Sequence, residues 1–376
     1  MTSEERRERR YQRRKADREL RRLIRSDGRD DFEAVFSYEH LYASYLKCRL
    51  GVSWKSSVQR FKARAPYEIY QIYRQLHEGT WKSRGFYEFD IVERGKLRHI
   101  RSVDMAERVV QRCLCDYALI PMIAPTFIFD NGATMKDKGY HFSINRCAHH
   151  LVEHVRKYGL NGYVLTFDFS KFFDNVSHEV IFDLVDRMFT DERIKDLVHT
   201  LVDAFGDKGL GLGSQVSQIF ALASANKLDH VIKEELQIKA YGRYMDDGYL
   251  ISESKEVLER ALARIREVCN ELHIKLNSKK TQIIKLTRGF TFLKCRFCLT
   301  ASGHLIRRLC RKSTTKTRRK LKALRRKLDE GTIGFPDAYQ SFQSWRAYAK
   351  HFDAFRSIRS IERIFNDLFV FMPDLG

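Results

Sequence analysis

The sequence predicts an α+β protein, in which a strand-rich centre lies between helical segments. From residue 32 to about residue 84, apolar residues recur at helical spacing, which is typical of several short helices. The run 163–167 and the segment KAYGRYMDDGYLISES are rich in β-forming residues and are bounded by turn residues. Beyond Gly303 the pattern becomes helical and strongly basic to the end of the chain. Together these three observations favour a mixed fold with a central sheet.

Length and charge narrow the class of function. At 376 residues the chain is long enough for a large core and for two or three structural units. Hydrophobic residues make up 43% and charged residues 31%, as in ordinary folded proteins. The 69 Lys and Arg exceed the 48 Asp and Glu, however, so that the net charge is +21. The first inference is therefore a polyanionic partner, either nucleic acid or an anionic membrane surface.

Neither a membrane span nor a disulfide framework is expected. The sequence lacks a run of about 18 apolar residues, and its first residues, MTSEERRERR, contain no apolar signal segment. We therefore expect a cytoplasmic protein that does not enter a membrane. The eight cysteines are scattered, which predicts buried thiols in a reducing compartment. Cys295 and Cys298 have CxxC spacing, but no second pair of Cys or His completes a zinc site.

The first half of the chain predicts mostly helices with one hairpin. Residues 1–30 carry twelve Lys or Arg and seven Asp or Glu at helical spacing, which fits either a solvated arm or an extension that grips RNA. Apolar residues on both sides of the turn 93–96 indicate a β-hairpin over 86–100. Helical periodicity covers 104–126, with an end expected near Pro121, and then 144–155.

The second half combines strands, helices and a basic tail. A strand over 163–167 leads directly into Asp168, and helices are expected over 180–189, 194–205 and 217–236. A strand, a tight turn and a second strand surround Asp246, Asp247 and Gly248, because Asp and Gly favour turns. A helix over 256–272 and strands near 282–284 and 291–297 follow. The stretch 306–327 has twelve Lys or Arg and no acid, which suits phosphate contacts along one helix.

Three aspartates lie at strand ends or turns, where carboxylates project together. Asp168 ends a predicted strand, and Asp246 and Asp247 lie on a hairpin tip. Nucleotidyl transfer needs two divalent ions held by carboxylates, and the hard ion Mg²⁺ requires oxygen ligands. An adjacent Asp pair is by itself usually only a turn, so the surrounding sequence decides the interpretation.

That surrounding sequence resembles the reverse transcriptase family. Tyr244-Met245-Asp246-Asp247 resembles its YxDD box, and FDFSKFFDNVSHE resembles the first catalytic box, which lies 78 positions upstream at Asp168. The resemblance extends over about 96–297 and implies a right-hand polymerase fold. The implied parts are a basic N-terminal arm (1–31), fingers (32–160), a palm with the catalytic boxes (161–297) and a basic helical thumb (298–376).

The resemblance also implies a metal site and a nucleotide site. Two Mg²⁺ ions, for which Mn²⁺ can substitute, are expected at Asp168, Asp246 and Asp247 and at the backbone carbonyl of Phe169. Lys96 and Arg98 resemble the fingers-hairpin cations that contact the triphosphate. Phe173 falls where the family places an aromatic gate against the ribose 2′-hydroxyl, and Lys280 where a cation meets the departing pyrophosphate.

One segment departs from the pattern of retroviral and mobile-intron enzymes. Their PQGxxxSP segment corresponds here to GLGLGSQVSQ when aligned on Gly213 and Ser217. Leu212 then replaces the Gln that touches the template–nucleotide pair, and Gln218 replaces the final Pro. Both replacements resemble diversity-generating retroelement enzymes and defence-associated or unclassified bacterial reverse transcriptases. Lower fidelity is the implied consequence.

Several basic residues are candidate nucleic-acid contacts, although each also fits an ordinary surface charge. GATMKDKGYHFSINR resembles a template-guiding segment, and FTFLKCRF resembles the primer-grip strands. The candidates are Lys136, Lys138, His141, Lys294, Arg318, Arg319 and Lys320.

The expected function is RNA-directed DNA synthesis by a bacterial retroelement or defence enzyme. The expected partners are a structured RNA template or non-coding RNA, dNTPs, the DNA product, and an accessory protein or a second copy of the chain. A defence polymerase that copies a partner RNA, or that works without a conventional template, is an alternative. An RNA-dependent RNA polymerase is disfavoured by Phe173, and a catalytically dead RNA-binding protein is disfavoured by the intact aspartates.

Overall fold

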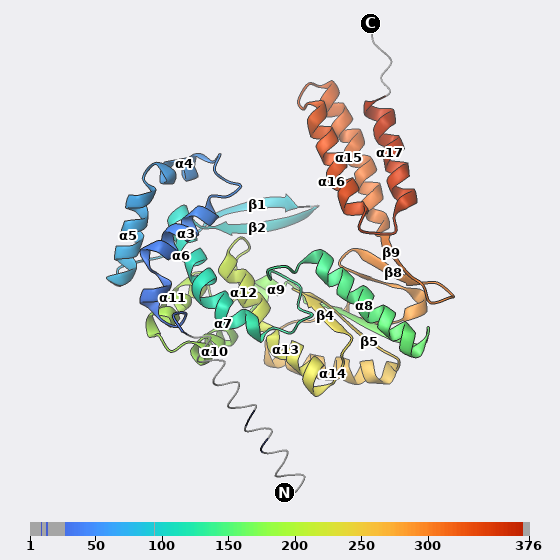
Figure 1. Ribbon diagram of the computed structural model, residues 1–376, viewed down its shortest axis with the longest axis horizontal. Helices are drawn as coiled ribbons and strands as arrows, with labels where there is room; N and C mark the ends of the chain where they lie inside the picture. The colour runs from blue at the N-terminus through green and yellow to red at the C-terminus, as the bar shows by residue number, and fades with distance from the viewer. Residues whose placement is uncertain (1–8, 10–12, 14–26, 94, 371–376) are drawn as a thin grey trace. The chain divides into compact units, whose positions relative to one another are not determined.

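The computed structural model describes residues 9, 13, 27–93 and 95–370, and it confirms an α+β fold (Figure 1). Contacts divide the chain into two compact units. The first unit comprises the described part of 1–137 together with 169–235 and 264–276. The second comprises 138–168, 236–263 and the described part of 277–376. The predicted basic arm, 1–31, falls almost wholly outside the described residues.

The first unit begins with short helices packed around α6. They are α2 (Phe32–Val35), α3 (Tyr38–Cys48), α4 (Ser56–Ala63), α5 (Ala65–His77) and α6 (Met105–Leu114). Side chains of Asp31, Ser37 and Asp104 accept hydrogen bonds from first-turn amides of α2, α3 and α6, which fixes where these helices start. Leu41 and Ile69 are fully buried, as the helical spacing predicts.

The predicted hairpin is confirmed as β1 (Tyr87–Glu93) and β2 (Lys96–Ser102), paired antiparallel. β2 also touches a glycine-rich segment more than 100 positions away. The backbone amide of Arg101 donates to the carbonyl of Leu212 at 3.3 Å, and Ile100 and Leu212 form a parallel bridge. The hairpin is therefore anchored at one edge within its own unit.

Two helix boundaries predicted for this unit are wrong. The helical path continues past Pro121 through a π-turn (Cys115–Leu119), α7 (Ile120–Ile123) and a short 3-10 turn. Pro121 lies directly after the π-turn, in which the Ile120 amide donates to the Cys115 carbonyl, so the wider turn precedes the residue that has no amide hydrogen. Residues 217–236 do not form one helix either, because non-helical Ala225 separates α12 (Gln215–Ser224) from α13 (Asn226–His230).

A π-turn, Val231–Glu235, then follows α13. Asn226, directly after the break, donates to the hydroxyl of Thr126 at 3.0 Å, a tertiary contact that local periodicity does not report. Two helices, α10 (His178–Met188) and α11 (Glu192–Asp203), match those expected over 180–189 and 194–205. The short helix α9 (Phe172–Asn175), directly after Asp168, was not expected.

The second unit is built on a four-stranded antiparallel sheet with the order β4-β5-β3-β6. Its strands are β3 (Tyr163–Asp168), β4 (Tyr241–Tyr244), β5 (Asp247–Ser252) and β6 (Gln282–Lys285). Helix α8 (Tyr140–Tyr158) packs against β4 and β5. Helix α14 (Lys255–Glu271) follows β5, as the sequence predicts.

A smaller sheet corrects two further predictions. The strand expected over 291–297 is a hairpin of β7 (Phe290–Phe292) and β8 (Cys295–Leu299), with Leu293 and Lys294 at positive φ in its turn. The chain also does not become helical directly after Gly303, because β9 (Leu305–Leu309) first pairs with β8. The many Arg residues there hid the two-residue period of a strand.

The C-terminal helices form a three-helix bundle: α15 (Arg311–Asp329), α16 (Phe335–Ala349) and α17 (Phe355–Phe369). Its core contains Leu321, Phe342, Ile361 and Phe365. All eight cysteines are free thiols; five are buried, as expected, whereas Cys48, Cys298 and Cys310 are half-buried. Burial raises the pKa of Cys295 to about 12. Among the described residues, no helix has the length and apolarity needed to cross a bilayer.

Candidate functional site

Two strands of the larger sheet bring carboxylates face to face. Asp168 is the last residue of β3, Asp247 is the first residue of β5, and the antiparallel register pairs them directly. Asp246 precedes Asp247 in the turn that joins β4 to β5. Directly opposed residues of an antiparallel pair have Cβ atoms only about 5 Å apart. The register therefore places these two side chains at the same end of one strand pair.

Asp168 is only 4% exposed and has two polar partners from the segment before β6. Lys280 Nζ lies 2.5 Å from Oδ2, and Asn277 Nδ2 donates to Oδ1 at 3.2 Å. The backbone amide of Asn277 also donates to the Asp168 carbonyl at 2.8 Å. A buried carboxylate requires such partners, since an unpaired charge away from water is costly.

Asp247 lies near two other carboxylates as well as near Lys280. Burial, followed by the negative charges of Asp246 and Asp168, raises the pKa of Asp247 to about 7, although Lys280 opposes the shift. Burial lowers the pKa of Lys280, but the hydrogen bond to Asp168 and the nearby carboxylates outweigh it, so that this pKa is raised overall. Neighbouring carboxylates therefore raise the pKa of both Asp247 and Lys280.

A buried arginine supports the turn that carries Asp246. Arg243 on β4 is fully buried, and its Nη1 donates to the Met245 carbonyl at 2.9 Å. Met245 has φ +53°, a left-handed conformation that is unfavourable for a side chain other than glycine. Such a conformation persists only where its surroundings hold it. Arg243 is thus a positioning group that sequence reasoning missed, although a charge inside a strand of buried residues was a usable signal.

The residues after Asp247 fit closely against their neighbours. A Cβ atom on Gly248 would lie 2.2 Å from the ring of Phe167, so only glycine fits opposite that ring. Tyr249, which follows, bonds to His150 of α8 through its hydroxyl and Nδ1, 2.9 Å apart. The residues after the turn therefore pack against β3 and bond to α8. Asn277 and His150, like Arg243, are supporting residues that the sequence motifs did not indicate.

The donor chemistry fits a hard divalent cation. The available ligands are carboxylate oxygens, and Mg²⁺ prefers oxygen ligands. Two of the three carboxylates, those of Asp168 and Asp247, lie on directly opposed residues and repel each other. As the side chains lie, however, the described residues contain no group of three or more His, Cys, Asp or Glu that could hold a metal ion. Asp168 is paired with Lys280 instead, so binding a cation requires that pair to yield.

Part of the predicted nucleotide site comes together in the first unit. Phe173 is half-buried, and its carbonyl accepts from the Leu210 amide at 2.7 Å. Gly213 has φ +116°, and a Cβ atom there would lie 3.4 Å from the Arg101 carbonyl of β2. Phe173, the segment with Leu212 and the strand that bears Lys96 and Arg98 are thus neighbours through backbone contacts.

The remaining predicted residues of this unit lie apart or make fewer described contacts. Phe169 is buried and forms an isolated antiparallel bridge with Leu276. Gln218 is exposed on α12, and Lys136 is exposed in the segment before α8.

The predicted nucleic-acid residues of the second unit lie on separate elements. Lys138 is half-buried beside the ring of Phe142, with its Nζ 5.2 Å from the centroid, and His141 is exposed in the first turn of α8. Lys294 is exposed at the β7–β8 turn. Arg318, Arg319 and Lys320 are exposed on α15.

Comparisons with known proteins agree with these features. The family model described as reverse transcriptase (RNA-dependent DNA polymerase) matches residues 83–297. Protein YkfC of Escherichia coli (strain K12) is 25% identical over 250 residues, which cover 53% of this chain and 62% of that protein. The chain therefore spans less than two thirds of this curated relative.

Solved structures of yeast telomerases are also similar, at low identity. Telomerase from Candida albicans in complex with a fragment of telomeric RNA is 10% identical, with a TM-score of 0.44 over 78% of this chain and 63% of that one. Apo telomerase from Candida tropicalis is 12% identical, with a TM-score of 0.44 over 77% and 60%. The family match, which covers more than half of the chain and includes all three aspartates, shows that this protein belongs to the reverse transcriptase family.

Proposed function

We propose that the chain is an RNA-directed DNA polymerase whose reaction takes place at Asp168, Asp246 and Asp247. One observation carries this proposal: the antiparallel register that opposes Asp168 and Asp247 at the end of β3 and β5, inside the matched family region. Carboxylates forced together against their own repulsion are typical of sites that hold cations for catalysis.

The three aspartates and the Phe169 carbonyl would hold two Mg²⁺ ions. When bound, such ions would supply a lower pKa for the attacking 3′-hydroxyl and positive charge beside the leaving pyrophosphate. Asp247, with its raised pKa, must lose its proton before it can serve as a ligand. Lys280 must leave Asp168 in the loaded state, and it would then be available to the departing pyrophosphate.

Substrate selection would depend on residues of the first unit. We assign triphosphate contacts to Lys96 and Arg98, and exclusion of the ribose 2′-hydroxyl to Phe173. Leu212, Gly213 and Gln218 would lie along the template–nucleotide pair. Fingers, palm and thumb are proposed at 32–160, 161–297 and 298–376. Lys136, Lys138, His141, Lys294 and the basic stretch 318–320 would contact nucleic-acid backbones.

Primer extension tests this function. The purified chain with an RNA template and a DNA primer should incorporate dNTPs in Mg²⁺ or Mn²⁺, and far less of the corresponding rNTPs. Asp246→Ala combined with Asp247→Ala should abolish extension while RNA binding survives. Asp183→Ala, an exposed aspartate on α10, is the control for loss of a carboxylate. Extension by the double variant would refute the site, and a strong preference for rNTPs would refute the product assignment.

Leu212 and Gln218 favour a bacterial retroelement or an antiviral defence system as the biological setting. Both positions depart from the retroviral pattern toward that of diversity-generating and defence-associated enzymes. The RNA partner would then be a structured non-coding RNA, with an accessory protein or a second copy of the chain as a further partner. Sequencing the nucleic acid that co-purifies from cells tests this: a single structured RNA and its complementary DNA are expected, and a random RNA population would reject it.

A further inference from the structure

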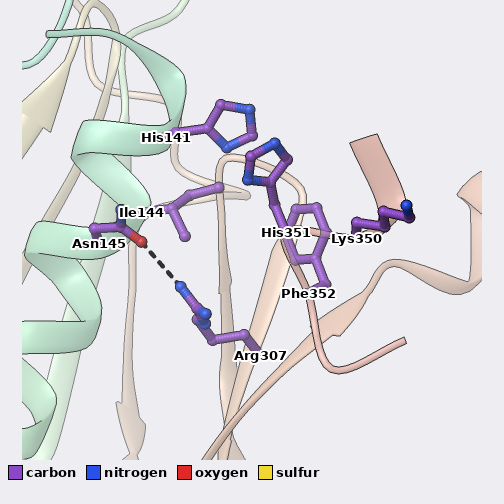
Figure 2. A pocket seen from close by; sticks show the side chains of 7 residues that line it. All are labelled: His141, Ile144, Asn145, Arg307, Lys350, His351 and Phe352. Atoms are coloured by element: carbon purple, nitrogen blue, oxygen red, sulfur yellow. Dashed lines mark hydrogen bonds between the residues drawn. The ribbon is translucent and has the colours of Figure 1, made fainter. Parts of the chain in front are cut away.

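A polar pocket lies in the second unit, formed by α8, β9 and the residues that follow α16 (Figure 2). Its volume is about 260 Å³. Ile144 and Phe352 are buried members of the core, whereas the other lining side chains carry polar groups. These polar residues are His141, Asn145, Arg307, Lys350 and His351. The lining therefore combines apolar support with groups that can bind a charged ligand.

The fixed charges of this pocket are positive. Arg307 and Lys350 both line it, and within the described residues neither forms a salt bridge with a carboxylate. The neighbouring Asp353 accepts from the backbone amide of Arg307 at 2.7 Å. One guanidinium nitrogen of Arg307 donates to Asn145 Oδ1 at 2.9 Å (Figure 2), which orients the group and leaves further donors for a ligand.

The two imidazoles add donors without forming a metal site. The rings of His141 and His351 lie 3.8 Å apart at an interplanar angle of 31° (Figure 2). They are the only His, Cys, Asp or Glu residues that line the pocket, and the described part of the chain contains no group of three such residues that could hold a metal ion. Two permanent cations beside them disfavour a metal further. The pocket therefore suits an anion.

The start of α8 supports the same choice. His141 lies in the first turn of this helix of 19 residues, whose N-cap is Gly139 and has no side-chain cap. The positive end of the dipole of this helix lies near His141 and favours an anion there. Tyr140 also bonds to Tyr348 of α16 through their hydroxyls at 2.9 Å, which holds the two sides of the pocket together.

We propose that this pocket binds a phosphate group. The guanidinium fork of Arg307 suits two oxygens of a phosphate, and the lysine and histidines can contact the others. The phosphate would come from a nucleic-acid strand or from free inorganic phosphate. The assignment to a strand rests on the polymerase function proposed above, whereas phosphate binding itself does not.

Helix α8 connects this pocket to the candidate active site. His141 lies nine positions before His150, which bonds to Tyr249 two residues beyond Asp247. Nine residues of helix span about 13 Å. This length of helix equals the length of a few nucleotides of a strand, which is the scale on which one strand would contact both sites.

Arg307→Gln combined with Lys350→Gln tests the proposal. The matched control is Arg156→Gln with Lys157→Gln, which removes the same two charges from exposed positions near the other end of α8. Inorganic phosphate, compared with chloride at equal ionic strength, should raise the melting temperature of the wild type and the control by about 2–4 °C at tenfold excess over Kd. The pocket variant should show no such rise, and an equal rise in all three proteins would overturn the proposal.

Fluorescence anisotropy with a 3′-labelled single-stranded oligonucleotide identifies the source. The pocket variant should bind about three- to tenfold more weakly than the control, and the slope of log K against log[salt] should fall by about 0.7 for each lost contact. A preference for a 5′-phosphorylated strand that only the pocket variant loses indicates a terminal phosphate. Equal weakening with and without that phosphate indicates the backbone. Oligonucleotide binding as tight as that of the control leaves inorganic phosphate as the ligand.

Two further measurements keep the proposal falsifiable. Lys350→Gln alone changes one exposed side chain, so its phosphate response reports on the pocket even if the double variant fails to fold. A chain that fails primer extension but shows the phosphate response at Arg307 and Lys350 rejects the polymerase and keeps the pocket. A chain that extends primers while its pocket variant matches the control in both assays rejects the pocket alone.

Discussion

The two sites of the second unit have opposite charge and are assembled differently. At the end of β3 and β5, strand register opposes Asp168 and Asp247, and burial, followed by the negative charges of Asp246 and Asp168, raises the pKa of Asp247. At the start of α8, the pocket gathers Arg307 and Lys350 without a carboxylate that pairs with either side chain in the described structure. The first arrangement attracts cations and the second attracts anions. A polymerase needs both, because it must bind metal ions and a polyanionic strand.

The largest effect is expected from Asp168→Asn, which should reduce activity without changing the binding of phosphate. Asp168→Asn removes the carboxylate that Lys280 and Asn277 orient, while it preserves shape. Primer extension should fall by about 10³-fold, since a lost metal ligand costs several kcal/mol of transition-state stabilisation. The response of the melting temperature to inorganic phosphate should remain that of the wild type. Loss of the phosphate response together with activity would show that the two sites are not independent.

A smaller effect is expected from Arg243, which supports the turn between β4 and β5 that carries Asp246. Arg243→Gln removes the hydrogen bond to the Met245 carbonyl and should reduce kcat about 10- to 100-fold, with KM for dNTP changed by less than about threefold. Arg243→Lys retains a donor and should recover part of kcat. Steady-state primer extension at saturating template measures kcat and the KM for dNTP separately. A change confined to KM would argue against a positioning role.

A change of pH tests how burial and the neighbouring carboxylates act on Asp247. The pKa of Asp247 is about 7 in the folded protein against an ordinary value of 3.8, so the folded state binds this proton more tightly than the unfolded state. Stability is therefore lost as pH rises from about 4 to 7, and the loss is complete above 7. Asp247→Asn should stabilise the metal-free protein at pH 8 by about 2 kcal/mol, roughly half of what the full shift converts to, because water screens part of it.

Melting curves from pH 8 down toward pH 4 check this sign. The advantage of Asp247→Asn should shrink as pH falls, because the wild-type carboxyl then becomes protonated and neutral as well. Added Mg²⁺ should stabilise the wild type more than the variant at pH 8. An advantage that stays constant with pH would mean that packing, and not charge, causes it.

The sequence predicted the elements that depend on neighbouring residues, but not those that depend on distant contacts. The strand before Asp168 and the hairpin at Asp246 were predictable because alternation and turn residues act over a few neighbouring positions. The break at Ala225 and the strand β9 were not, because tertiary contacts of Asn226 and pairing with β8 decide them. Local pattern therefore locates elements but does not decide where distant contacts interrupt them.

The candidate sites divide in the same way. Short motifs contain the three aspartates and suggested Lys280, whose ion pair with Asp168 is present in the structure. Arg243 and Asn277 lie within those segments, but their roles depend on burial and hydrogen bonds. In the pocket only His141 had been a candidate, as a template contact. Arg307 and His351 join it from more than 160 positions away, and only the fold brings them together.

The smallest expected effect refines the charge of the pocket. Lys350→Gln should weaken binding of a single-stranded oligonucleotide by about twofold to fivefold, because one exposed cation contributes little in water and is screened by salt. Lys157→Gln near the other end of α8 should have a smaller effect at the same ionic strength. Anisotropy titrations at several salt concentrations distinguish the two variants. The slope of log K against log[salt] should fall for Lys350→Gln but not for Lys157→Gln. Equal slopes for both variants would mean that Lys350 acts through the net charge of +21 and not through a specific phosphate contact.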